Sequence, residues 1–188
     1  MSLPRIIGIG GNVRRPSRTR ALIEEIVAAT VRAAPAETRI FDLIDAGPGL
    51  GAAWTRRDLT PEALAVVEAI EGADALVVGT PVYKGAYTGL FKHLFDFVDP
   101  QALDGVPVVL TATGGGPKHA LVVEHSLRPL FGFFNALAVP TAVYAGEADI
   151  VDGTLANPVV RERAHAAARQ LAQLIRAPAT HAALQAAG

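Results

Sequence analysis

The stretch RIIGIG at residues 5–10 runs directly into GNVRRPSRT at residues 11–19, and this junction decides the fold. The first segment is a short apolar, β-branched run ending in glycine, which is typical of a strand buried on both faces of a parallel sheet. Ser17 stands at the N-cap position of a predicted helix, since apolar residues follow it at helical spacing as far as about Ala34. A strand, a polar loop and a helix in this order are typical of an α/β fold.

Strands and helices alternate along the rest of the chain. Further strands are predicted at residues 39–43, 74–80, 106–112 and 139–145. Helices are predicted at residues 61–71, 88–98, 117–138 and 158–176, and a glycine-rich loop at residues 45–60. Five strands joined by short connections indicate a flavodoxin-like, doubly wound parallel sheet of order 2-1-3-4-5 in a three-layer α/β/α arrangement. One domain is expected over residues 1–188, with residues 177–188 frayed.

Composition excludes several classes of function. A chain of 188 residues that is 51% apolar fits one α/β domain. The net charge is −1 and the Lys and Arg residues are scattered, so neither nucleic acid nor a membrane surface is an expected partner. The absence of cysteine excludes disulfides, thiolate catalysis and cysteine-based metal sites. Neither a signal peptide nor an apolar run of about 18 residues is evident, so we expect a cytoplasmic protein.

The loop after the first strand is predicted to bind a phosphate monoester. Ligands of open α/β sheets bind beyond the carboxyl ends of the strands, where the loops after strands one, three and four meet in this order. In the first of these loops Asn12, Ser17 and Thr19 supply neutral donors, Arg14 supplies charge, and the helix N-terminus adds its partial positive charge. The dinucleotide fingerprint is absent, because Val13 stands where its third glycine or alanine belongs. The alternative is a polar, well-capped turn.

The other two loops are suited to a flat ring. Residues 80–89 combine apolar residues and glycines with Tyr83 and Tyr87, so backbone amides and an aromatic side chain could meet an isoalloxazine edge. Residues 113–117 contain three glycines, which allow close backbone approach, and Thr113 adds a hydroxyl. The alternatives are a packed turn and a flexible turn.

Together these motifs resemble the NAD(P)H-dependent FMN reductase family. The resemblance rests on GxxRxPSRT at residues 11–19, PVYK at 81–84 with YTG at 87–89, and TGG at 113–115. It extends from about Ile6 to Ala148. Residues 119–131 carry a finer resemblance to the reductases of two-component methane- and alkanesulfonate monooxygenase systems.

The resemblance implies an NAD(P)H:FMN oxidoreductase that supplies reduced FMN to a flavin-dependent sulfonate monooxygenase, a transient partner. The implied cofactors are FMN and NADPH or NADH. The FMN phosphate is expected at Asn12, Arg14, Ser17 and Thr19. The flavin ring is expected against Pro81, Val82, Tyr83, Lys84, Thr113, Gly114 and Gly115. No catalytic acid or base is predicted, because hydride passes between the two cofactors.

The predicted helix at residues 117–138 is expected to build a subunit interface. Its apolar run comprises Leu127, Pro129, Leu130, Phe131, Phe133 and Phe134. This is more apolar surface than a helix covering one side of a sheet needs, so we expect a homo-oligomer, a tetramer built as a dimer of dimers. His125 stands where an alkanesulfonate relative has a tyrosine on a π-bulge, and we interpret it as an interface or core residue. A proton donor or ligand is the alternative.

Other interpretations stay open at this point. A quinone or azo-dye reductase could use the same scaffold. A flavodoxin-like electron carrier is disfavoured, because such carriers are usually strongly acidic and lack an arginine in the phosphate loop. His93 and His119 have no carboxylate at ligand spacing, so no metal site is predicted. Trp54 has two interpretations, a cover for a neighbouring subunit's site or ordinary surface packing.

Overall fold

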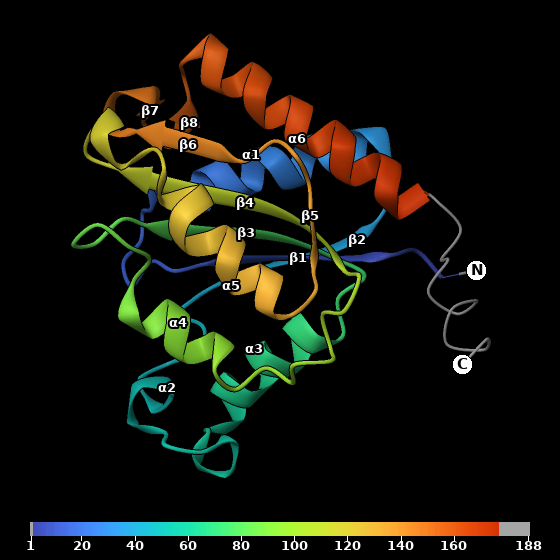
Figure 1. Ribbon diagram of the computed structural model, residues 1–188, viewed down its shortest axis with the longest axis vertical. Coiled ribbons are helices and arrows are strands. Elements are labelled where there is room, and N and C mark those ends of the chain that lie inside the picture. Colours follow the sequence, from blue (N-terminus) through green and yellow to red (C-terminus); the bar gives the residue numbers. More distant parts are fainter. Residues whose placement is uncertain (1, 177–188) are drawn as a thin grey trace.

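A parallel sheet with helices on both of its faces forms the body of the protein (Figure 1). The computed structural model describes residues 2–176, so the segment predicted to fray lies outside the described residues. The main strands are β1 (Arg5–Gly10), β2 (Glu37–Asp42), β3 (Ala75–Pro81), β4 (Pro107–Gly114), β5 (Leu137–Ala138) and β6 (Val143–Gly146). Their order is β2-β1-β3-β4-β5, with β6 also paired to β4, which confirms the predicted flavodoxin-like order.

Two helical layers bury the central strands of the sheet. The helices are α1 (Arg18–Ala33), α3 (Pro61–Glu71), α4 (Gly89–Phe95), α5 (Arg128–Phe133) and α6 (Pro158–Arg176). Helices α1 and α6 cover one face, and α3, α4 and α5 cover the other (Figure 1). Neighbouring residues of β1 therefore pack in opposite layers, Ile6 with α1 and Ile7 with the opposite layer. Because both faces are covered, β1, β3 and β4 are mostly apolar and buried on both faces rather than alternating.

Capping residues fix the helix starts where the sequence predicts them. Ser17 Oγ accepts a hydrogen bond from the Arg20 N–H (3.3 Å), and Thr88 caps α4 in the same way. The predicted helix at 88–98 ends at Phe95. The predicted loop at residues 45–60 is more ordered than expected, since it contains α2 (Gly49–Ala52) and a 3₁₀ turn at Arg56–Asp58.

The prediction of one long helix at residues 117–138 is wrong. The segment consists of a 3₁₀ turn (Pro117–His119), a π-helix (Val123–Leu127) and α5, and its last two residues form the strand β5. Pro129 has no N–H to donate to a carbonyl four residues earlier, so regular α-helical bonding cannot run through this point. At the far end Asn135 has a left-handed φ of 54°, and the Ala136 N–H bonds to the Phe131 carbonyl in a Schellman motif. The π-helix expected around His125 is confirmed.

The predicted strand at residues 139–145 starts too early, because residues 139–142 belong to no strand and β6 begins at Val143. The chain pairs with β4 as β5, leaves the sheet, and pairs with β4 again as β6. Pro140 lies in the gap, and a proline cannot donate the ladder hydrogen bond that a continuous strand needs. β5 and β6 therefore pair with different stretches of β4.

Most of the apolar run that suggested an interface is core. Leu127, Leu130, Phe131 and Phe134 are buried within this one chain, and Phe131 packs edge-on against Phe95 at 5.0 Å between ring centroids. The prediction of a large uncovered apolar face is therefore wrong, because α4 and the sheet already cover it. Phe133 is 70% exposed. No helix in the described part of the chain is long and apolar enough to cross a membrane.

Candidate functional site

A cavity of about 570 Å³ opens at the carboxyl ends of β1, β3 and β4. It is lined by Asn12, Val13, Arg14, Pro16, Ser17, Arg18, Thr19, Pro81, Val82, Tyr83, Thr113, Gly114, Gly115, Ile150, Asp152 and Gly153. All of the predicted site residues except Lys84 are in this set. The sequence thus identifies the three loops that meet, as the topology requires.

Hydrogen bonds between the three loops hold them in register. The Gly11 N–H donates to the Gly79 carbonyl (2.7 Å), which ties the first loop to β3. The Val82 N–H donates to the Thr113 carbonyl (2.8 Å). The hydroxyls of Thr19 and Thr113 lie 2.6 Å apart, both residues being buried, and this contact joins the start of α1 to the end of β4. The walls of the cavity are therefore joined to one another by hydrogen bonds of the chain itself.

The first loop places an electropositive helix end at the cavity. Ser17 uses its oxygen to accept the capping bond from Arg20, so its hydroxyl hydrogen remains available to a ligand. Helix α1 has 16 residues and no acidic residue in its first turn. Its free N–H groups and dipole therefore favour an anion at this end.

Four arginines follow one another closely in this region, and their partners distinguish them. Arg15 is bound bidentately by Asp42 (2.7 and 2.9 Å) and also contacts Asp45. Arg18 forms an ion pair with Glu147. Arg20 pairs with carboxylates on α1 and β2. Arg14 has no carboxylate partner within residues 2–176, so it is the arginine of this loop whose charge is free for a ligand.

The fixed charge of Arg15 affects the pKa of the nearby Asp45 carboxyl. Partial burial alone would raise the pKa of Asp45, but the Asp42 N–H and the Arg15 guanidinium outweigh burial and lower that pKa below its usual value. The side-chain hydrogen bonds of Arg15 to Asp42 and then to Asp45 raise the pKa of Arg15. Arg15 is therefore a structural cation, although it stands beside Arg14 in the sequence.

Asn12 carries an unsatisfied polar atom at the cavity. The side chain is 5% exposed, and its Nδ2 donates to the Arg14 carbonyl at 3.2 Å. Its Oδ1 is buried and has no hydrogen-bond partner among the described residues. A buried acceptor without a partner is costly, so it is suited to a ligand that brings a hydroxyl or N–H donor.

The glycines of the loop after β4, residues 113–117, differ in what they face. A Cβ on Gly114 would lie 2.5 Å from the Tyr144 hydroxyl, whereas a Cβ on Gly115 would meet no atom within 4 Å. Tyr144 itself donates to the Gly116 carbonyl at 2.6 Å and so supports the loop. Burial raises the pKa of Tyr144, and this hydrogen bond opposes the shift only in part. Gly115 is thus the position where backbone borders open cavity.

The loop after β3, residues 80–89, forms a tight turn with a tyrosine at the cavity. Tyr83 and Ala86 exchange backbone hydrogen bonds, with Lys84 and Gly85 in left-handed conformations at the tip. Lys84 therefore lies outside the residues that line the cavity. Tyr83 is 55% exposed on the cavity wall, while Tyr87 packs against α4.

A fourth wall of the cavity is not predicted from the sequence. It is the hairpin formed by β7 (Ile150–Val151) and β8 (Thr154–Leu155), which supplies three lining residues. The adjacent Asp152 and Gly153, with φ of 48° and 75°, form its turn. An Asp-Gly pair between short apolar segments is a hairpin signal that could have been recognised in the sequence.

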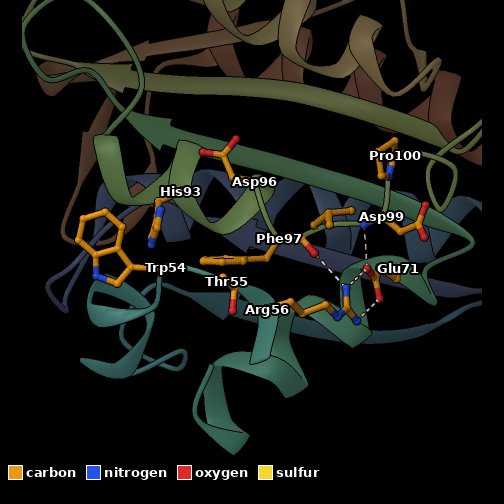
Figure 2. Close-up of a pocket in the computed structure, with 10 residues that line it drawn as sticks. Trp54, Thr55, Arg56, Glu71, His93, Asp96, Phe97, Asp99 and Pro100 are labelled. Carbon is orange, nitrogen blue, oxygen red and sulfur yellow. Dashed lines mark hydrogen bonds and ion pairs between the residues drawn. The ribbon is translucent and has the colours of Figure 1, made fainter. Parts of the chain in front are cut away.

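A second open cavity of about 710 Å³ lies away from these loops, beside α4 (Figure 2). Its main charges neutralise each other, because Arg56 is bound bidentately by Glu71 and also donates to the Phe97 carbonyl. His93 Nε2 lies 3.0 Å from a backbone carbonyl oxygen of α2. Trp54, at its edge, is 92% exposed, so ordinary packing within this chain does not account for it. The charged groups here have structural partners and contrast with the free Arg14 of the first cavity.

Comparison with known proteins gives consistent matches. Residues 4–149 match the family model described as NADPH-dependent FMN reductase. The chain is 45% identical to the NADH-dependent FMN reductase SfnF of Pseudomonas fluorescens, covering 93% of this chain and 94% of that protein. It is 42% identical to an FMN reductase (NADPH) of Pseudomonas aeruginosa, covering 90% and 91%. An oxidoreductase structure from Corynebacterium diphtheriae superposes with a TM-score of 0.83 at 34% identity, covering 93% and 98%.

Proposed function

The chain belongs to the NADPH-dependent FMN reductase family and is an NAD(P)H:FMN oxidoreductase, and from this premise we propose that it supplies reduced FMN to a flavin-dependent sulfonate monooxygenase in the cytoplasm. The observation that carries the site assignment is the cavity built jointly by the three loops. The finer resemblance of residues 119–131 supports the choice of partner.

The residues present fit FMN. Arg14, the Ser17 hydroxyl and the start of α1 would hold the phosphate, because together they offer one free charge, one donor and a helix dipole. Asn12 Oδ1 would accept a ribityl hydroxyl. Gly115 leaves room for the ring to lie against backbone. When bound, FMN supplies the ring that accepts hydride from the nicotinamide, and the protein contributes alignment.

The proposal extends to the assembly. We expect a homotetramer with the π-helix segment at one interface, where His125 is exposed and Phe133 is the large exposed side chain of α5. The buried part of the apolar run does not support this interface, which we propose from the exposed residues and the π-helix.

A coupled assay tests the proposed function. Purified protein, FMN, a nicotinamide and a flavin-dependent sulfonate monooxygenase are combined, and sulfite release is measured with NADH and with NADPH. We expect sulfite to appear only when the reductase and FMN are both present. Rapid reduction of quinones or azo dyes, with no sulfite formed, would instead favour the alternative function, a quinone or azo-dye reductase.

A further inference from the structure

The β7–β8 hairpin forms a fixed wall of the flavin cavity. Ile150 pairs with Leu155 across the hairpin, and both side chains are buried in the layer that contains α1 and α6. The turn residues Asp152 and Gly153 remain exposed and line the same cavity as the loop after β1, residues 11–19. Apolar packing thus anchors the hairpin, while its turn residues line the cavity.

Hydrogen bonds at the base set the position of this tip. Asp149 accepts from the Gly146 N–H (2.7 Å) with one carboxylate oxygen and from Asn157 Nδ2 (2.6 Å) with the other. Arg161 Nε donates to the Leu155 carbonyl at 2.9 Å. Because both ends of the hairpin are pinned, the backbone of Asp152 is held at the wall of the cavity.

The charges that line the cavity nearly balance. They are Arg14, Arg18 and Asp152. Arg18 is neutralised by Glu147, which lies just before the hairpin. Within residues 2–176, neither Arg14 nor Asp152 has an ion-pair partner. A phosphate dianion in this cavity therefore meets one free cation, the end of α1 and one free carboxylate.

We propose that Asp152 is an affinity-setting residue that weakens the hold on the FMN phosphate by electrostatic repulsion, so that the flavin exchanges instead of remaining bound. This rests on the proposed function, in which the flavin must leave for a partner enzyme. Repulsion between the carboxylate and the phosphate acts on FMN and is absent for riboflavin, which carries no phosphate. It requires no new contact with the ring.

The test is the substitution Asp152→Asn, which removes the charge and keeps a side chain that tolerates the left-handed turn. Dissociation constants for FMN and riboflavin are measured by calorimetry at low salt and at about 0.5 M salt. The FMN dissociation constant should fall about three- to ten-fold at low salt and much less at high salt. The riboflavin constant should stay within about two-fold.

Glu37→Gln is the matched control. It removes the same charge from an exposed residue at the amino end of β2, the opposite edge of the sheet, and should change neither constant. An unchanged FMN constant in Asp152→Asn, or equal changes for both flavins, would overturn the inference while leaving the flavin site intact. A wild-type protein that binds neither flavin would overturn the proposed function and this inference with it.

Discussion

Replacing Arg14 with alanine should weaken FMN binding and leave riboflavin binding almost unchanged. The neighbouring arginines are held by carboxylates, Arg15 by Asp42 and Asp45 and Arg18 by Glu147, whereas Arg14 has no carboxylate partner among the residues that the structure describes. Its removal therefore takes charge from a ligand and breaks no ion pair of the fold. The expected loss is specific to the phosphate.

The magnitude follows from the exposure of the side chain. A hydrogen bond to a charged group contributes about 1.5–3 kcal/mol. Arg14 is exposed, so solvent screening favours the lower part of this range, and a loss of about 1.5–2 kcal/mol corresponds to about 10- to 30-fold in the dissociation constant. For riboflavin the change should be less than about two-fold, since the phosphate is missing. Added salt should reduce the difference between the two flavins.

Calorimetric titration of both flavins into wild type, Arg14→Ala and Arg57→Ala measures this effect. Arg57 is an exposed arginine on the 3₁₀ turn after α2 and serves as the control for loss of one positive charge. Equal losses for FMN and riboflavin in Arg14→Ala, or a similar loss in Arg57→Ala, would refute a phosphate contact by Arg14. Unchanged thermal unfolding of Arg14→Ala would show that the fold does not depend on it.

Three further substitutions test other parts of the account. Gly115→Val should weaken FMN and riboflavin alike by about 1–3 kcal/mol, because its side chain would enter open cavity, and Gly115→Ala should do so less; unchanged titrations would remove this loop from the site. Partial burial would raise the pKa of Glu71, but Arg56 and the Asp99 N–H outweigh burial and lower that pKa. Ionised Glu71 therefore stabilises the fold above its unfolded pKa of about 4.3. This stabilisation is lost as the pH falls through the pKa of Glu71 in the folded protein. Glu71→Gln should therefore lower the urea midpoint at neutral pH, which corresponds to a loss of about 1–2 kcal/mol in unfolding free energy. It should also make the unfolding free energy fall less steeply at acid pH than in the wild type. Curves of unfolding free energy against pH that run parallel for the two proteins would contradict the role of the ion pair. His125→Ala should shift sedimentation toward smaller species without lowering the thermal midpoint, and a wild type that sediments as a monomer at micromolar concentration would contradict the proposed interface.

Local sequence signals predict the parts of the fold that depend on near neighbours. The strand at residues 5–10, the Ser17 cap and the last helix are where the sequence places them. The long helix fails because its ends depend on single residues, Pro129 and Asn135, whose effect an apolar pattern does not show. Periodicity also cannot distinguish a helix that covers the core of its own chain from one that faces a partner.

The candidate site shows the same division. The three loops are predictable because topology brings the carboxyl ends of these strands together. The partners of the arginines are not, because Arg15 finds Asp42 27 residues away and Arg18 finds Glu147 129 residues away. The difference between Gly114 and Gly115 likewise depends on where β6 places Tyr144.

The most direct test of the site is a crystal structure of the protein with FMN. The account predicts the phosphate within hydrogen-bond distance of Ser17 and the first turn of α1, and the ring between residues 81–83 and 113–115. A flavin seated instead in the second cavity beside Trp54, with the three loops empty, would contradict it.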